Sequence, residues 1–369
     1  MLEKNKDTVL FIHGINSRHG GANQEVLISW VQQLRDEFDK VSVFHIDPWF
    51  ISRTTRIRAF FSILWYLPGS FFRLFHNPIF EYLYKLSPFT LISFLMQYIR
   101  ISPTVVIFNH HSVFYLSLII PKKKRIYISH DSLYKKSNIH RSLNALKKYI
   151  FNTEMMILSK ATKIFFLSYH EHRFFNRYLS GKCTLIHGAT SNLIPYYGKY
   201  DPYDIAIIGD WRRPVNIRGL LKFFDNYSLV KLLLDEKYSF TIYGINSFEA
   251  YSLLKKINVN SYVGFHLGGI YKDFKDIPQG FIFVPVYEGA GIKSKVIESL
   301  INSRIVIGTP KAFVGVPWDI IVNHSRIVWT ISDFLDLSKI NLTPFNSDTF
   351  LKYRNLYKPI AKSINTISI

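Results

Sequence analysis

The sequence contains one cysteine, Cys183, among its 369 residues. A single thiol excludes an intrachain disulfide and a cysteine-rich zinc site, which is typical of a protein kept in a reducing cytoplasm. Long hydrophobic runs are also missing. The longest apolar stretch, residues 105–120, is interrupted by Asn109, His110 and His111, and it is shorter than the roughly 20 residues that a transmembrane helix needs. Because the N-terminus has no signal-peptide pattern either, we expect a cytoplasmic protein that is soluble or peripheral on the inner face of the cell membrane.

Several catalytic motifs are absent as well. Residues 11–17, FIHGINS, are similar to the first strand and HG loop of an α/β-hydrolase, but the chain has no G-x-S-x-G pentapeptide for the nucleophile elbow of that fold. His170-Glu171-His172 is not the H-E-x-x-H of a metalloprotease, and the histidines near residues 110 and 130 lack the spaced ligand set of a zinc site. We therefore expect neither a hydrolase of this type nor a bound metal or other cofactor.

Acidic residues are few: Asp and Glu number 26 against 46 Lys and Arg, which gives a formal net charge of +20. This excess favours an anionic partner: nucleic acid, an anionic membrane or a phosphorylated substrate. Within residues 53–101, arginines and lysines are mixed with dense Phe, Trp and Tyr, and Glu81 is the only acidic residue. Such a segment suits the interface of an anionic membrane, although the same aromatic residues would equally serve as core between two helices.

The most informative stretch is residues 281–309, FIFVPVYEGAGIKSKVIESLINSRIVIGT. It begins with an apolar run and continues with small residues, a segment whose apolar side chains recur at helical spacing, and a second apolar run. The pattern predicts a βαβ unit consisting of a buried parallel strand, a glycine-rich turn, a helix and a second strand, at residues 281–286, 289–291, 292–301 and 304–308 respectively.

Three charged residues in this βαβ unit indicate its ligand. Lys293 and Lys295 fall in the first turn of the expected helix, where cations oppose the helix dipole unless an anion is bound beside them. Glu298, one turn further on, can accept hydrogen bonds from two neighbouring hydroxyls. Because such units bind ligands where the strand ends and the helix begins, these residues predict a nucleotide-diphosphate site.

The sequence GAGIKSKVIESL, followed by a strand and GTP, resembles the donor-site signature of family-4-type glycosyltransferases of the GT-B fold. The resemblance implies that Glu298 holds the nucleotide ribose and that Gly244, in a neighbouring loop, borders the nucleotide. It also implies contacts to the donor diphosphate from Gly289, Gly291, Ile292 and Lys293.

One position departs from the family pattern. Many relatives carry two glutamates in an E-x7-E arrangement, of which Glu298 matches the second. The first would fall at Ala290, and the nearest carboxylate belongs to Glu288. This departure leaves the identity of the donor sugar open.

The start of the chain also fits an α/β domain. Residues 8–13 predict a strand that leads to Gly20 and Gly21 and then to a helix, an arrangement whose first loop approaches a phosphate. The resemblance, which is looser here, places Gly20 and Gly21 in the loop that faces the donor diphosphate.

Polar residues follow two further strands of the first half. The strand expected at residues 104–108 ends in Asn109-His110-His111, and the strand expected at 125–129 ends in His130-Asp131. Open α/β sheets keep their ligands at such strand ends. In the family, a comparable HD pair lies beside the donor sugar and the acceptor, which implies that His130 and Asp131 are catalytic.

The second half restarts the α/β pattern after residues 191–203, which are rich in Pro, Gly, Tyr and Asn and predict a domain boundary. A strand at residues 204–208 is followed by GDWRRP, which looks like the opening of the family's donor domain. There a basic residue contacts the pyrophosphate, and either Arg212 or Arg213 fits this role, with Arg212 as our choice.

These features predict an α/β protein of the GT-B fold, with two Rossmann-like domains facing each other across a cleft. We expect an acceptor-binding domain at residues 1–195, a donor-binding domain at 200–345, and a helix within 346–369 that packs back on the first domain. The expected activity is a metal-independent hexosyl transfer from a nucleotide diphosphate sugar to a hydroxyl of a lipid-linked or surface-polysaccharide acceptor. Retention at the anomeric carbon follows only from the resemblance.

Two alternatives come from other classes. Basic residues interleaved with aromatics would suit a protein that binds single-stranded nucleic acid, although the chain has no recognised nucleic-acid motif and we expect no such partner. A catalytically inactive GT-B scaffold is the other alternative, because the first glutamate of the family pattern is missing.

Overall fold

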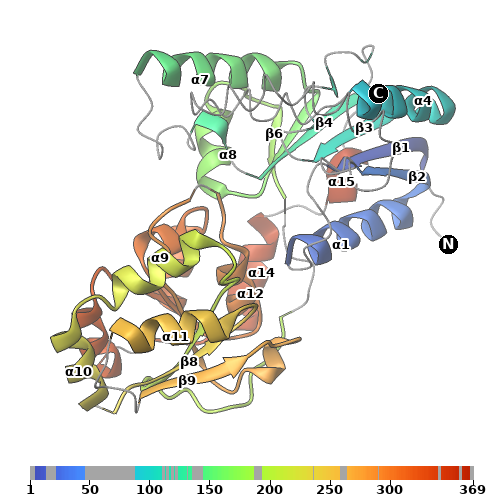
Figure 1. Ribbon diagram of the computed structural model, residues 1–369. Coiled ribbons are helices and arrows are strands. Elements are labelled where there is room, and N and C mark those ends of the chain that lie inside the picture. Colours follow the sequence, from blue (N-terminus) through green and yellow to red (C-terminus); the bar gives the residue numbers. More distant parts are fainter. Residues whose placement is uncertain are drawn as a thin grey trace. The chain divides into compact units, whose positions relative to one another are not determined.

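Figure 1 shows the computed structural model of the chain, which divides into two compact units. Unit 1 comprises Met1–Thr190 and Tyr357–Ile369, and unit 2 comprises Ser191–Leu356. The residues that the structure describes are 5–13, 22–45, 88–109, 113, 116–117, 120, 124–130, 132–134, 144–186, 193–235, 237–257, 264–289, 291–339, 342–356 and 360–365.

Unit 1 contains a six-stranded parallel sheet with the order β2-β1-β3-β4-β5-β6. Its central strands are runs of β-branched and aromatic residues, because both faces of a parallel sheet are covered and few polar side chains are tolerated there. The strands are β1 (Asn5–His13), β2 (Phe38–His45), β3 (Val105–Asn109), β4 (Lys124–Ser129), β5 (Lys163–Phe166) and β6 (Cys183–Leu185).

The described helices of unit 1 include one from the far end of the chain. Helix α15 packs against α1, although more than 300 residues separate them in the sequence. No described helix is long and apolar enough to cross a bilayer. The described helices of this unit are α1 (Ala22–Glu37), α4 (Pro88–Ile101), α7 (Asn144–Ser159), α8 (Tyr169–Asn176) and α15 (Ile360–Asn365).

Unit 2 contains a second six-stranded parallel sheet with the order β12-β11-β10-β7-β8-β9. Aromatic side chains fill one side of it, where Phe283 contacts Phe223 and Phe334 with ring centroids 4.5 and 5.0 Å apart. The strands are β7 (Asp204–Ile208), β8 (Ser239–Tyr243), β9 (Phe265–Gly269), β10 (Phe281–Val284), β11 (Ile305–Gly308) and β12 (Ser325–Ile327).

The described helices of unit 2 connect these strands in the manner of a Rossmann-like fold. Helix α9 lies so close to the loop after β10 that a Cβ added at Gly219 would stand 2.2 Å from the carbonyl oxygen of Pro285. The α-helices are α9 (Pro214–Phe223), α10 (Tyr227–Asp235), α11 (Ser247–Ile257), α12 (Ser294–Ile301), α13 (Trp318–His324) and α14 (Ser347–Leu356), and the 3₁₀ helices are η4 (Phe274–Asp276), η5 (Pro310–Phe313) and η6 (Ile331–Lys339).

Each sheet has one topological switch point, where consecutive strands are added on opposite sides of a central strand. In unit 1, β2 lies on one side of β1 and β3 on the other. In unit 2, β8 lies on one side of β7 and β10 on the other. The loops that leave these strands diverge, so ligands of open α/β sheets bind beyond the carboxyl ends of the strands at these points.

The predicted α/β class with two Rossmann-like units is confirmed by the two parallel sheets. Three local predictions differ from the structure. Helix α12 begins at Ser294, because Ile292 and Lys293 still belong to the loop and Lys293 has the extended conformation of an N-cap. The sequence also predicts a strand at 262–265, but β9 lies at Phe265–Gly269, and its exposed positions explain why no apolar run marks it. The segment 346–369, which is expected to pack back on the first domain, is divided in the structure: α15 lies in unit 1 and packs on α1, whereas α14 belongs to unit 2.

Candidate functional site

The loop after β7 is anchored by a buried tryptophan. Trp211 is fully buried, its Nε1 donates a hydrogen bond to the Tyr243 carbonyl at 2.9 Å, and its backbone N–H donates to the Ile245 carbonyl. Gly244 has φ +118°, and a Cβ there would lie 1.9 Å from the Gly209 carbonyl oxygen. The loops after β7 and β8 are therefore held together, and only glycine fits at position 244.

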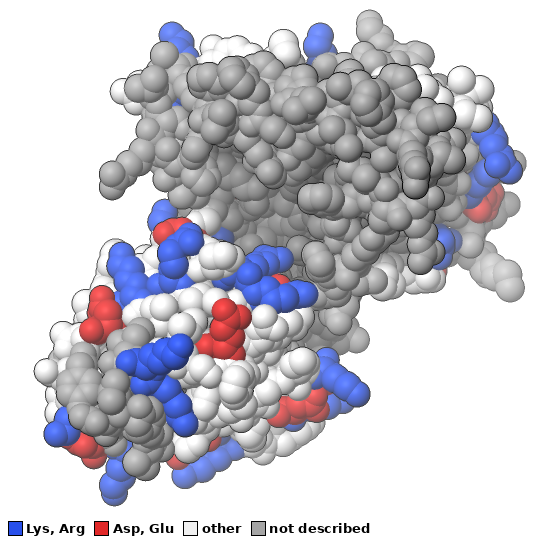
Figure 2. Space-filling model, viewed as in Figure 1, with Lys and Arg blue, Asp and Glu red and all other residues white. Residues whose placement is uncertain are grey.

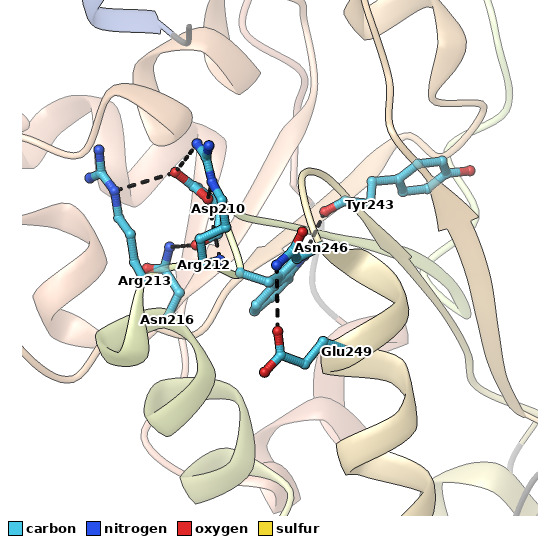
Figure 3. A network of polar contacts seen from close by, with 8 residues as sticks. Asp210, Arg212, Arg213, Asn216, Tyr243, Asn246 and Glu249 are labelled. Carbon is cyan, nitrogen blue, oxygen red and sulfur yellow. Dashed lines mark hydrogen bonds and ion pairs between the residues drawn. The ribbon is translucent and has the colours of Figure 1, made fainter. Parts of the chain in front are cut away.

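Next in this loop, one carboxylate holds two arginines at the start of α9 (Figure 3). Arg212 donates from Nε and Nη2 to the two oxygens of Asp210 at 2.8 and 2.9 Å, and Arg213 Nε lies 3.5 Å from the same carboxylate. Hydrogen bonds from Arg212 lower the pKa of Asp210. Asn216 donates to the Asp210 carbonyl at 2.8 Å, which ties the loop to the first turn of α9.

The loop after β10 brings a third cation. Gly289 and Gly291 have φ +109° and +73°, conformations that side-chain-bearing residues rarely adopt. Lys293 Nζ donates to the Gly291 carbonyl at 3.1 Å, and a Cβ on Gly289 would lie 3.1 Å from the same ammonium group. As the N-cap of α12, Lys293 provides no side-chain acceptor for the first amides of the helix, and its charge opposes the helix dipole.

Lys295 connects α12 to β7. Its Nζ donates to the Ile208 carbonyl at 3.3 Å. Burial, followed by the charges of Lys293 and Arg213, lowers the pKa of Lys295 to about 7, while Asp210 and Glu298 act in the opposite direction. The cations are thus close enough to repel one another, and a bound anion would relieve that repulsion.

These side chains lie at the switch point of the unit 2 sheet, beyond the ends of β7 and β10. The structure brings together in one unit the residues of the two loops that the sequence predicts to contact a diphosphate. They are Arg212, Arg213, Gly289, Gly291, Ile292 and Lys293, with Lys295 and the partly buried Glu298 on α12 and Gly244 in the adjoining loop.

Glu288, the nearest substitute for the missing first glutamate, has a partner of its own. Its Oε2 accepts a hydrogen bond from Arg218 Nη2 at 2.7 Å, and both side chains are largely exposed. This ion pair joins the loop after β10 to α9. Ala290, which stands where the family glutamate would be, lies outside the described residues.

In unit 1, the structure places His130 at the end of β4 beside a polar residue of β3. His130 Nε2 is 2.5 Å from Asn109 Oδ1, and Asn109 Nδ2 is 2.8 Å from Nδ1 of His13, at the end of β1. Gly20, Gly21, Asp131, His110 and His111 lie outside the described residues. No role is predicted for His13 or Asn109 themselves, although each ends an apolar strand with a polar residue.

Two buried glutamates that sequence reasoning also missed hold the turn after His130. Glu154 of α7 accepts hydrogen bonds from Ser132 Oγ, Leu133 N and Tyr134 N at 2.9, 3.0 and 2.9 Å. Glu171 of α8 accepts one from Ser132 N at 3.1 Å. An acidic residue flanked by apolar residues within α7 is the signal that would have indicated Glu154. Glu171 lies in the first turn of α8, where an acidic residue is common, so the sequence gives no such signal for it.

Within the part of the chain that the structure describes, no three His, Cys, Asp or Glu side chains come together in a group that could hold a metal ion. The charges of the unit 2 site come instead from arginine, lysine and the N-terminus of α12. Groups of this kind bind phosphates directly.

No protein-family model and no curated protein sequence matches the chain. Solved structures do match it. HepE from Anabaena, in complex with UDP and glucose, has a TM-score of 0.60 at 10% identity, over 98% of this chain and 100% of that one. Sucrose-phosphate synthase from Thermosynechococcus elongatus also has a TM-score of 0.60, at 14% identity over 90% of this chain and 88% of that one. The chain has the GT-B fold.

The same fold is shared by a protein with another reaction. A putative UDP-N-acetylglucosamine 2-epimerase from Listeria monocytogenes matches with a TM-score of 0.56 at 11% identity, over 98% of this chain and 97% of that one. At such identities the likeness concerns the fold, so the function has to be argued from the site.

Proposed function

We propose that this chain is a glycosyltransferase that moves a sugar from a nucleotide diphosphate sugar to a hydroxyl group of an acceptor. The observation that carries the proposal is the gathering of Arg212, Arg213, Lys293 and Lys295 at the switch point of the unit 2 sheet. The HepE structure, which shares the fold, is a complex with UDP and glucose. A nucleoside diphosphate carries the negative charge that these cations and the N-terminus of α12 suit.

The chemistry follows from the leaving group. When the bond between the sugar and the diphosphate breaks, negative charge grows on the diphosphate, and fixed cations stabilise it without reorganisation. Lys293 and Arg212 serve this purpose in the proposal, with Glu298 accepting hydrogen bonds from the ribose and no metal required. Transfer of a hexose with retention is part of the proposal, and the anomeric configuration of the product, read by NMR, tests it.

Thermal unfolding with a panel of nucleoside diphosphates tests the donor site. A diphosphate at 100 times its dissociation constant should stabilise the protein by about 2.7 kcal/mol. The shift should occur with one base preferentially and disappear in Glu298→Ala and in Lys293→Ala. Arg218→Ala, which removes only the exposed ion pair with Glu288, is the matched control and should keep the shift. If no diphosphate shifts the folded wild type, the proposed function is wrong.

The acceptor in this proposal is lipid-linked or a surface polysaccharide, and the chain contacts an anionic membrane through residues 53–101. Residues 53–87 lie outside the described residues, whereas 88–101 form α4. On α4, Ile92, Met96 and Ile99 recur at helical spacing and are 55%, 68% and 74% exposed. An exposed apolar stripe beside basic residues suits the headgroup region of an anionic bilayer, which would cover it.

Sedimentation with lipid vesicles tests this contact. We expect the wild type to bind vesicles that contain phosphatidylglycerol and to bind pure phosphatidylcholine vesicles much less, because each basic residue near an anionic surface adds about 1 kcal/mol. Replacing Ile92, Met96 and Ile99 by serine should abolish binding. The matched control is Ile28→Ser on α1, a residue that is similarly exposed at 59%. Equal binding of the triple variant would contradict the role of α4.

The nucleic-acid alternative is not favoured by the charge distribution. On the face of unit 2 that Figure 2 shows, basic side chains are interspersed with acidic ones rather than forming a continuous track. A single strand needs such a track along its backbone. Salt-sensitive binding of oligonucleotides would restore this alternative, and diphosphate binding without turnover would indicate an inactive scaffold.

A further inference from the structure

A buried hydrogen-bond network lies at the switch point of the unit 1 sheet. His13 and Asn109 are register partners at the ends of β1 and β3, and they are 3% and 1% exposed. Asn109 Nδ2 lies 2.8 Å from His13 Nδ1, and Asn109 Oδ1 lies 2.5 Å from Nε2 of the partly buried His130. One amide therefore bridges two imidazoles from opposite sides.

The hydrogen atoms in this network follow from the chemistry of the groups. Burial, and after it the neighbouring His130 and His45, lowers the pKa of His13 to about 3, so His13 is neutral at physiological pH. A neutral imidazole has one donor nitrogen and one acceptor nitrogen. Asn109 Nδ2 only donates, so His13 Nδ1 accepts and the proton of His13 is on Nε2. Asn109 Oδ1 only accepts, so His130 Nε2 carries a hydrogen.

We propose that Asn109 is a positioning residue: it holds His130 by its Nε2–H and makes Nδ1 the nitrogen that gains or loses a proton. This proposal rests on the proposed function and on the catalytic role that the family resemblance implies for His130. His13 stays neutral and accepts from Asn109 Nδ2 in this orientation of the amide. His45, whose ring is centred 5.8 Å from that of His13, is the neighbour on β2.

This orientation of the amide suits a histidine that must carry or transfer charge. His130 can take up a proton at Nδ1 and keep its hydrogen bond to Asn109 Oδ1 in both states. The reversed amide would present Nδ2 to His130 Nε2, would require the proton on Nδ1, and would exclude the imidazolium form. Asn109 therefore keeps the ring in one place while its charge changes, as general acid–base catalysis or charge stabilisation requires.

The histidine tautomer can be read directly by long-range ¹H–¹⁵N NMR of the imidazole side chains. The chain has 13 histidines, so the signal of His130 is assigned by its loss in His130→Gln. We expect His130 to be protonated at Nε2 in the wild type. Asn109→Leu, which has a similar size and no acceptor, should release it to a mixture of tautomers. Asn109→Asp keeps an acceptor for Nε2–H and should restore the fixed tautomer.

Turnover gives a second readout, with hydrolysis of UDP-glucose as the probe reaction. The kcat of Asn109→Leu should fall about 100-fold with an unchanged KM, and Asn109→Asp should recover most of it. A His130 proton on Nδ1 in the wild type, or an unchanged tautomer in Asn109→Leu, would overturn the proposal. If Asn109→Leu does not fold, the wild-type spectrum and Asn109→Asp decide the matter.

Titration with UDP and the other nucleoside diphosphates separates this proposal from the one on which it rests. All variants at position 109 should bind a diphosphate as the wild type does, because the cations proposed to bind it, Arg212, Arg213 and Lys293, are in unit 2. A wild type that binds none of them contradicts the proposed function, whatever the tautomer of His130. A wild type that binds one but has His130 protonated at Nδ1 contradicts only the role of Asn109.

Discussion

Replacing Glu154 with leucine should lower the free energy of unfolding of unit 1 by about 3–5 kcal/mol, because three donors lose their shared acceptor in a buried place. Glu154 is 4% exposed, and its carboxylate accepts from Ser132 Oγ and from the backbone N–H groups of Leu133 and Tyr134. Ser132 and Leu133 are buried, so water does not readily replace the carboxylate there. Urea unfolding followed by circular dichroism measures the loss.

Two further variants make this experiment specific. Glu154→Gln keeps one carbonyl oxygen and should cost less than the leucine substitution, about 1–2 kcal/mol, because only part of the acceptor capacity is lost. Glu249→Gln changes an exposed glutamate of α11 that accepts one long hydrogen bond from Asn246, and it should change stability by less than about 0.5 kcal/mol. A leucine variant as stable as the wild type would show that the turn after β4 does not depend on Glu154.

The same three donors belong to the turn that follows His130, so the prediction also concerns function. Glu154 and Glu171 reach this turn from two different helices, α7 and α8. A loosened turn should disturb His130 while leaving the unit 2 site intact. We therefore expect the leucine variant to bind nucleoside diphosphate below its unfolding transition and to lose turnover.

The sequence predicts the buried central strands of the sheets well and the short edge strands poorly. Strands such as β3 and β10 are buried at every position, so their apolar runs identify them directly. β12 has three residues and no apolar run, and it forms as a strand only because β11 is beside it. Its existence depends on the tertiary structure rather than on local propensity.

The two candidate sites differ in the same way. The cations of the unit 2 site and Glu298 lie in two short loops and a helix whose glycines and spacing are visible in the sequence, so the sequence names each of them and the structure brings them together in one unit. That they bind a diphosphate stays a prediction. The contact between His13 and Asn109 joins residues 96 positions apart. It exists because β3 pairs with β1 on the side opposite β2, and no local pattern specifies that order.

The affinity for nucleoside diphosphate should fall as the pH rises above 7, by up to tenfold per pH unit, because Lys295 gains a proton when the anion binds. In the free protein, burial and then Lys293 and Arg213 lower the pKa of Lys295 to about 7. A diphosphate beside these cations favours the charged form and raises that pKa. At pH values between the pKa of Lys295 in the free protein and its pKa in the complex, binding takes up a proton. The affinity therefore falls as the pH rises through this range.

Calorimetric titration with UDP from pH 7 to 9 measures this effect. A terminal phosphate loses its second proton near pH 6, so the ligand is fully ionised throughout this range. Repeating the titration in two buffers with different ionisation enthalpies counts the protons taken up. Lys295→Arg, which stays charged at these pH values, should bind with an affinity that hardly changes with pH. A wild-type affinity that is constant from pH 7 to 9 would contradict the prediction.

The free energy of unfolding should depend on pH with the opposite sign: it should increase as the pH rises above 7. The folded-state pKa of Lys295, about 7, is below the ordinary lysine value of 10.5, so the unfolded chain binds more protons between these two values. The contribution of Lys295 to stability therefore increases as the pH rises from 7, by at most about 1.4 kcal/mol per pH unit. If the stability of the free protein rises with pH while its affinity for UDP falls, and both trends vanish in Lys295→Arg, then Lys295 is the cause of both.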